Sequence, residues 1–344
     1  MLEHHHPLEP YLKGSDLSYF QNVSWEKVDQ KCSEVLGQAC YGIPSIRVGL
    51  CWTMEFLGLS RHRDHVLVPK FLGRCIGNTL NRFALPVESP TPATRLVLVV
   101  DQYGLRQDVK SIRQECEIRK CVYVEDSPYG LGAAETLGPG SLARFVGLTK
   151  ILPVVQGGMM ICENPELIKW VKKKRDETSR WSWLVWGSMA FLRHQRMSSS
   201  HSAIAEAAYE LYVEARGGNR FLRGNIMSAL KKVDSLGAEE KRRWQLLEAR
   251  LGSRILMPDF RKLGYVAPFL ANGQSEMIEP LFAKEGFDGT SYHIEMNRNL
   301  FSPRYEKVFL IPINPRIKMK FFEKLVTSLE QTSLEDKSGM KSTQ

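Results

Sequence analysis

Short apolar runs alternate with longer polar stretches between residues 65 and 162. The apolar runs cover residues 65–71, 94–101, 121–126 and 157–162. Near-continuous apolar runs of this length are typical of strands buried on both faces, and strands that are separated by helices pair in parallel. The pattern therefore predicts an α/β fold, with a mainly parallel central sheet flanked by helices.

The pattern changes after Cys162, where helical periodicity dominates. Asn164 and Pro165 suit the cap and first position of a helix. The other predicted elements are helices over 201–218, 225–251 and 318–330 and a strand over 308–313. We expect a large domain over residues 1–220, a small α+β C-terminal domain over 221–332, and a polar, disordered tail over 333–344.

The composition is that of an ordinary globular protein, with 43% hydrophobic and 25% charged residues among 344. It argues against a disordered chain and against a collagen-like fibre. No continuous apolar window reaches about 18 residues, so we expect no membrane span. The most apolar stretch, Trp181–Leu192, suits a core helix or a surface that faces a partner.

The formal charge of +9 suits an anionic partner, which could be nucleic acid, an anionic membrane or a phosphate-bearing small molecule. No basic–aromatic repeat or nucleic-acid-binding motif is present, so we do not expect nucleic acid. Seven scattered cysteines without a C-x-x-C pair indicate reduced thiols and no metal site. The first twenty residues do not have the pattern of a secretory signal, so we expect a cytoplasmic protein.

Two segments carry side chains with candidate chemistry. The run CVYVED ends with Glu125 and Asp126, and Lys150 lies among apolar neighbours further along. Ligands of parallel sheets bind at the carboxyl ends of the strands, where a buried aspartate is costly unless a cation meets it. A desolvated lysine is a competent amine nucleophile. The alternatives are a surface lysine in a turn before Pro153, or one half of a structural ion pair.

Four sequence blocks occur in an order and spacing known from one family. They read DHVLVPKF, RLVLVVDQYGLRQDV, VYVEDSPYGLGA and GLTKILPVVQGGMMI, within residues 64–162. Together they resemble the DegT/DnrJ/EryC1/StrS family of sugar aminotransferase-like enzymes, which have the type I fold of pyridoxal 5′-phosphate (PLP)-dependent transferases. The resemblance continues more faintly through 223–252 and 308–329, and it is poor over 175–215.

The resemblance implies roles for four residues around the ring of PLP. Lys150 would hold the cofactor as a Schiff base and shuttle a proton, and Asp126 would pair with the pyridinium nitrogen, so that the ring serves as an electron sink. Tyr129 would lie beside the ring. Phe71 would stack on the ring, because Gly73 stands at the family's usual aromatic or histidine position.

At the phosphate of PLP, the resemblance implies two further residues. Gly49 would lie in a turn whose backbone amides cradle the phosphate at a helix start, and Asn225 would reach the phosphate from a partner subunit. The chain departs from the family here, because residues 47–51 replace the Ser-Gly-Thr turn and no hydroxyl residue stands at 146–147. Arg47 could supply a cation instead.

A fourth departure lies in the block DQYG, where Asp101 replaces the usual histidine. The function that the resemblance implies is a PLP-dependent aminotransferase, with an amino acid such as glutamate as donor and a keto substrate, usually a nucleotide-linked keto-sugar, as acceptor. The alternatives are a PLP-dependent lyase, dehydratase or carbon–carbon bond-forming biosynthetic enzyme, and a non-catalytic protein with this fold. The resemblance also implies a homodimer with shared active sites.

Overall fold

A computed structural model describes most of the chain. The described residues are 22–131, 136–154, 156–177, 184, 220–257, 263–287, 289–315 and 317–339. The predicted helix over 201–218 lies outside them, as does nearly all of the poorly matching stretch 175–215, including the apolar segment 181–192 apart from Leu184.

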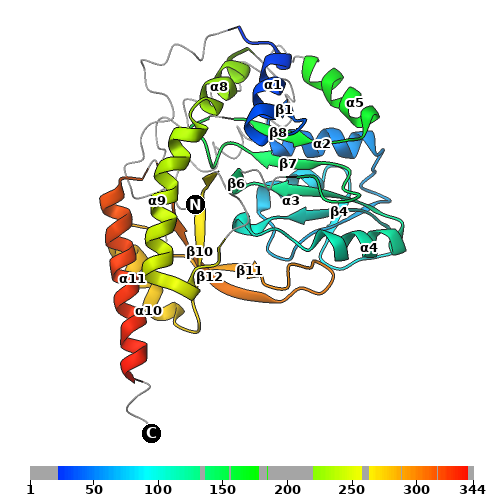
Figure 1. The fold of residues 1–344 in the computed structure, drawn as a ribbon. Coiled ribbons are helices and arrows are strands. Elements are labelled where there is room, and N and C mark those ends of the chain that lie inside the picture. Colours follow the sequence, from blue (N-terminus) through cyan, green and yellow to red (C-terminus); the bar gives the residue numbers. More distant parts are fainter. Residues whose placement is uncertain are drawn as a thin grey trace.

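A seven-stranded sheet forms the centre of the large domain in the described part of the chain (Figure 1). Its order is β1-β8-β7-β5-β4-β2-β3. The strands are β1 (Tyr41–Ile43), β2 (His65–Leu67), β3 (Leu85–Val87), β4 (Thr94–Val100), β5 (Val122–Ser127), β7 (Arg144–Gly147) and β8 (Gly158–Ile161). Strands β2, β3, β4, β5 and β7 pair in parallel, whereas β8 runs antiparallel to β7 and to β1. The predicted mainly parallel sheet is confirmed.

Helices cover both faces of this sheet. They are α1 (Trp25–Leu36), α2 (Ile46–Phe56), α3 (Arg74–Leu80), α4 (Val109–Arg119) and α5 (Pro165–Asp176). Along β4, Leu96 and Leu98 join the apolar cluster beneath α2, while Val97 and Val99 join the cluster beneath α4. This alternation is the reason that the sequence of β4 is apolar at nearly every position.

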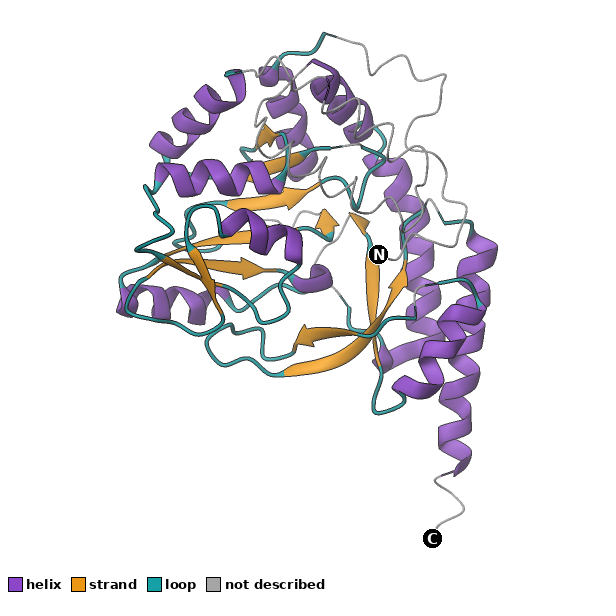
Figure 2. Cartoon of the chain, turned by 180° about the vertical axis from the view of Figure 1, so that it is seen from behind, coloured by secondary structure: helices purple, strands orange, loops and turns teal. Residues whose placement is uncertain are grey.

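The small domain has a three-stranded antiparallel sheet with helices packed against it (Figures 1 and 2). Its strands are β10 (Val266–Leu270), β11 (Tyr292–Glu295) and β12 (Tyr305–Pro312), in the order β10-β12-β11. Helices α9 (Val233–Leu251), α10 (Ser275–Lys284) and α11 (Met319–Gly339) pack against this sheet, whereas α8 (Arg220–Leu230) shares a core cluster with α1 of the large domain. Single turns of 3-10 helix lie at Gln102–Gly104, after β4, and at Gly252–Arg254, after α9. Helix α11 continues past the predicted end at residue 330, into the tail expected to be disordered.

A short ladder joins the two parts of the chain. Strand β6 (Gly130–Leu131), which follows directly after β5, pairs with β9 (Leu263–Gly264). The end of β5 is thereby held close to the small domain. Among the described residues, no helix combines the length and apolar character that crossing a membrane requires.

Candidate functional site

The candidate site lies at one end of the strands of the central sheet, where β5, β7, β8 and the start of α2 meet. β5 and β7 terminate at this edge, and β8 begins there, because its first residue, Gly158, pairs with Gly147, the last residue of β7. A side chain at Gly147 would lie 3.0 Å from Ile46 Cδ1 and 3.3 Å from Pro128 Cα, and one at Gly158 would lie 3.2 Å from the Ile46 nitrogen. The two glycines therefore let the start of α2 approach the ends of the strands.

Lys150 and Tyr129 meet at this edge. Lys150 lies in a turn after β7, in which the amide of Leu152 donates to the carbonyl of Leu148 at 2.8 Å. The side-chain amide of Asn314 donates to the Lys150 carbonyl at 3.0 Å, so the small domain holds the turn. The Lys150 ammonium lies 3.6 Å from the centroid of the Tyr129 ring, within the range of a cation–π interaction.

Asp126 completes the group as a buried carboxylate at the end of β5. It is 2% exposed, and its Oδ1 has no hydrogen-bond partner. Burial raises the pKa of Asp126 to about 7, and the positive charge of Lys150 opposes that rise. Three of the predicted residues, Asp126, Tyr129 and Lys150, therefore lie together, with one carboxylate oxygen free to accept a hydrogen bond.

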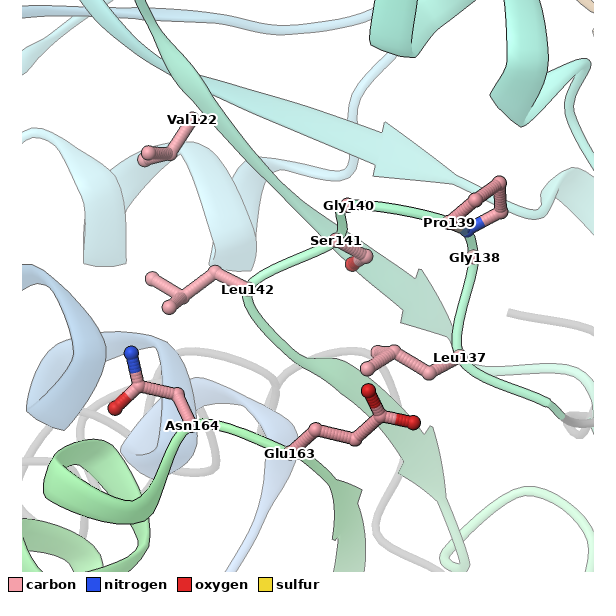
Figure 3. Close-up of a pocket in the computed structure, with 9 residues that line it drawn as sticks. All are labelled: Val122, Leu137, Gly138, Pro139, Gly140, Ser141, Leu142, Glu163 and Asn164. Carbon is pink, nitrogen blue, oxygen red and sulfur yellow. The ribbon is translucent and has the colours of Figure 1, made fainter.

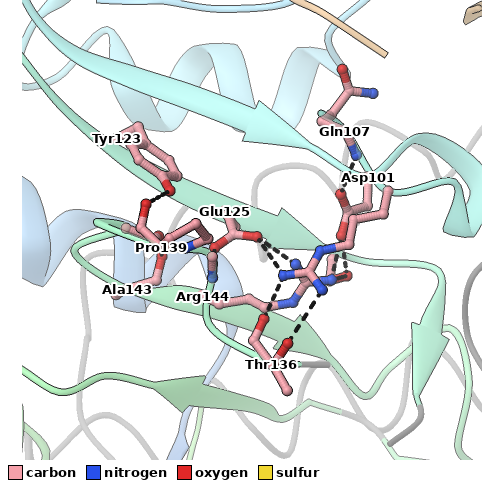
Figure 4. A network of polar contacts seen from close by, with 12 residues as sticks. Asp101, Gln107, Tyr123, Glu125, Thr136, Pro139, Ala143 and Arg144 are labelled. Carbon is pink, nitrogen blue, oxygen red and sulfur yellow. Dashed lines mark hydrogen bonds and ion pairs between the residues drawn. The ribbon is translucent and has the colours of Figure 1, made fainter. Parts of the chain in front are cut away.

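A buried ion-pair network around Arg144 (Figure 4) acts on Asp126 through its charges. Arg144, which begins β7, donates to the carboxylates of Asp101 and Glu125. The hydroxyl of Ser127 donates to Asp101 Oδ2 at 2.8 Å. The charge of Asp101 raises the pKa of Asp126, and the charge of Arg144 lowers it. The network therefore sets part of the electrostatic environment of the candidate site.

Sequence reasoning missed Arg144. The signal was present, because an arginine that begins a run as apolar as RFVG must meet a carboxylate if the strand is buried. The structure also gives Asp101 a partner, so the residue that replaces the family's histidine is one half of a buried ion pair with Arg144.

Gly49 does not lie in a turn at a helix start, where the resemblance places it. Helix α2 starts at Ile46 with Ser45 as its cap, so Gly49 lies one turn inside the helix. Its amide donates to the Ser45 carbonyl at 3.0 Å, and its Cα faces the ring of Phe145. The first turn of α2 contains Ile46 and Arg47 instead, and Arg47 is 8% exposed.

Replacing Gly49 with alanine tests this packing role. The new methyl group would lie 2.7 Å from Phe145 Cε1 and 2.8 Å from Ile43 Cδ1. We expect a loss of about 1–3 kcal/mol in the free energy of unfolding, because added atoms in a filled core force neighbours apart.

Gly77→Ala in α3 is the matched control, since no atom lies within 4 Å of its added carbon. We expect this change to stabilise the protein by about 0.4–1 kcal/mol. Urea unfolding of both variants decides, and equal effects would contradict the packing role.

The prediction that Phe71 covers a cofactor ring is not supported by its packing. Its ring stacks on His293, with 4.1 Å between centroids, and meets the edge of Tyr305. Both partners belong to the small domain, in β11 and β12. The neighbouring Lys70 amide donates to the Tyr305 hydroxyl at 3.1 Å. Phe71 therefore belongs to the contact between the two domains.

Asn225 lies in α8 and is 0% exposed within its own chain. Leu222 and Ile226 on the same helix pack in a cluster with Leu148, so α8 belongs to the core of its own subunit. The role of Asn225 toward a partner subunit stays a prediction.

A hollow of about 350 Å³ lies at the opposite edge of the sheet (Figure 3). It is lined by Val122, by residues 137–142, and by Glu163 and Asn164. Val122 is the first residue of β5, whereas Asp126 lies near its end. The Asn164 side-chain oxygen accepts the amides of Glu166 and Leu167 as the cap of α5. This hollow is therefore separate from the group around Lys150. The described residues contain no cluster of His, Cys, Asp and Glu that could hold a metal ion.

Solved aminotransferase structures share this fold over nearly the whole chain. The putative sugar aminotransferase Spr1654 from Streptococcus pneumoniae, in its PMP form, has a TM-score of 0.64 at 12% identity and covers 99% of this chain and 100% of its own. The aminotransferase TlmJ from Streptoalloteichus hindustanus has a TM-score of 0.60 at 15% identity, covering 97% and 100%. PseC from Helicobacter pylori, an aminotransferase involved in the biosynthesis of pseudoaminic acid, has a TM-score of 0.61 at 13% identity, covering 96% and 98%.

These likenesses confirm the predicted fold, which is that of the PLP-dependent sugar aminotransferases. At such identities they show the fold alone. No protein-family model matches the chain, and no curated protein matches it in sequence.

Proposed function

We propose that this chain is a PLP-dependent aminotransferase that acts through Lys150. It would transfer an amino group from an amino acid such as glutamate to a keto substrate. The observation that carries the proposal is the buried Asp126, whose Oδ1 has no hydrogen-bond partner, beside a lysine that lies over Tyr129. A pyridinium N–H is the kind of cationic donor that such an oxygen lacks.

Asp126, Tyr129 and Lys150 suit the ring of PLP. At the phosphate, Arg47 and the backbone amides of α2 would take the place of the family's Ser-Gly-Thr turn. Asp126 would accept the hydrogen bond of the pyridinium nitrogen, and Tyr129 would position the Lys150 ammonium. At the phosphate end, the amides at the start of α2 and the Arg47 guanidinium would provide positive potential. Ile46 stands at this helix start, with its side chain beside Gly147.

When bound, PLP supplies an electron sink conjugated to the amino group of the substrate. Lys150 has two tasks in this proposal. Its Nζ would hold the cofactor through the cofactor's carbonyl carbon, and as a free amine it would move a proton from Cα of the donor. Asp126 would hold the ring nitrogen, and a pyridinium charge there would favour the carboxylate form of Asp126.

The acceptor that we propose is a nucleotide-linked keto-sugar. One structure with the same fold is DesI, solved in the presence of its TDP-sugar product, with a TM-score of 0.63 at 11% identity. The formal charge of +9 suits an anionic substrate of this kind. We also propose that the chain forms a homodimer. Sedimentation equilibrium would measure the mass of this dimer.

A PLP titration tests the proposed function. We expect a visible absorption band to appear in the wild type and to be absent from Lys150→Ala. Lys172→Ala is the matched control, because Lys172 also lies over a tyrosine ring, that of Tyr41 at 5.2 Å, but away from Asp126. This variant should bind PLP like the wild type. A protein that stays colourless with added PLP would contradict the proposal.

Addition of glutamate to the loaded protein separates the reaction classes. Conversion of the visible band to that of the pyridoxamine form supports transamination. An unchanged band argues against glutamate as donor and leaves the lyase, dehydratase and carbon–carbon bond-forming alternatives to be assayed.

A second candidate is a non-catalytic protein with this fold. The apolar side chain of Ile46, at the helix start where a phosphate would bind, favours this candidate. A colourless, folded protein is the result that this second candidate predicts.

A further inference from the structure

The end of α4 brings two cysteines together. The helix closes with Lys120 in the left-handed conformation, at a φ of 55°. The Lys120 amide donates to the Glu117 carbonyl at 3.3 Å, and the Cys121 amide donates to the Cys116 carbonyl at 3.0 Å. This pair of bonds defines the Schellman motif, in which the first and last side chains of the closed loop contact each other. In most such motifs that contact is apolar, whereas here both side chains are thiols.

The two thiols differ in access. Cys116 is 3% exposed and packs with Ile112 and Tyr123 against the sheet, whereas Cys121 is only partly buried. A hydrogen bond from the Cys116 thiol lowers the pKa of Cys121, and the nearby Arg119 charge lowers it further. The same interaction raises the pKa of Cys116. The accessible sulfur is therefore the better nucleophile, and the enclosed sulfur is held beside it.

We propose that Cys116 and Cys121 form an oxidisable dithiol, a modification site whose reactant is hydrogen peroxide. The Cys121 thiolate attacks one peroxide oxygen, the O–O bond breaks, and the distal oxygen leaves as water after protonation, which gives a sulfenic acid. The Cys116 sulfur then attacks the Cys121 sulfur, the S–O bond breaks, and a second water leaves. The two thiols lose two electrons and the peroxide gains them. The product is a disulfide between the end of α4 and the start of β5.

The other cysteine pair of the chain provides an internal comparison. Cys32 and Cys40 also interact through their side chains, but they are 0% and 1% exposed. Both side chains are therefore enclosed, in contrast to the partly exposed Cys121. Cys75 is exposed, so it reports the background reaction of an accessible thiol. The proposal is independent of PLP and of the proposed function.

Peroxide treatment of the full chain, followed by denaturation and tryptic digestion without reductant, tests the proposal. Trypsin cleaves after Lys120, so Cys116 falls in the peptide 114–119 and Cys121 in the peptide 121–144. We expect these two peptides to be joined by a disulfide, with the mass of two hydrogens lost, and the link to disappear on reduction. The pair Cys32–Cys40 should remain reduced under the same conditions.

Two variants separate the roles of the sulfurs. Cys116→Ser should stop the reaction at the sulfenic acid, so that dimedone labels Cys121 more than in the wild type. Cys121→Ser should leave Cys116 reduced. Cys75→Ser is the control and should form the same link as the wild type. The proposal is overturned if peroxide oxidises Cys75 while the peptides 114–119 and 121–144 stay separate, or if Cys121 accumulates as a sulfenic acid in the wild type.

Discussion

Replacing Arg144 with methionine is expected to lower the free energy of unfolding by about 3–5 kcal/mol, as removal of one partner from a buried ion pair does. The Arg144 side chain is 2% exposed and bridges Asp101 and Glu125, which are 3% and 0% exposed. Without the guanidinium, Asp101 loses this salt bridge and Glu125 keeps only the longer one to Arg106, at 3.5 Å. Urea unfolding at pH 7 measures the loss.

The matched control for this change is Arg113→Met. Arg113 also pairs with a glutamate, Glu117, but both side chains are about half exposed. Water screens such a pair, so we expect a much smaller loss than for Arg144→Met. Combining Arg144→Met with Asp101→Asn and Glu125→Gln should recover part of the stability, because the uncompensated charges are then removed. Equal losses in the Arg144 and Arg113 variants would contradict the structural role of the network.

Replacing Asp126 with asparagine is expected to stabilise the cofactor-free protein at pH 8 by up to about 4 kcal/mol. Burial raises the pKa of Asp126 to about 7, so the folded state binds this proton more tightly than the unfolded chain does. Stability from this group is therefore fully present below about pH 4 and is lost as the pH rises to about 7. Asparagine resembles the protonated acid at every pH. The difference between variant and wild type should vanish near pH 4.

Asp64→Asn provides a control of the opposite sign. The Arg63 side chain, by its hydrogen bond, lowers the pKa of Asp64, so this carboxylate stabilises the protein at neutral pH and loses that effect in acid. The Asp64 variant should be less stable than the wild type at pH 8, and the difference should shrink as the pH falls. Added PLP should raise the melting temperature of the wild type more than that of Asp126→Asn. Parallel pH profiles for both variants and the wild type would refute the assignment.

The sequence predicted those parts of the fold that depend on burial over short distances. The apolar alternation of β4 follows from two covered faces, and Asn164 and Pro165 start α5 as expected, with the Asn164 oxygen accepting two amides. Asp126 and Lys150 could be brought together from sequence because adjacent parallel strands end at the same edge of a sheet.

The contacts that sequence reasoning missed lie between distant segments. The start of α2 lies before Arg47, so Gly49 lies one turn inside the helix, against Phe145. Asn225 is enclosed because α8 packs into its own subunit, and Phe71 contacts His293, which lies far along the chain. Neither contact leaves a local pattern in the sequence.

Borohydride reduction of the PLP-loaded protein, followed by peptide mapping, tests the central proposal most directly. Reduction fixes PLP to whichever lysine has bound it. We predict that the label lies on Lys150 in the wild type and in Lys172→Ala, and that Lys150→Ala takes up none under the same conditions. A label spread over surface lysines such as those at 172–174, with Lys150 unmodified, would contradict the assignment of this site.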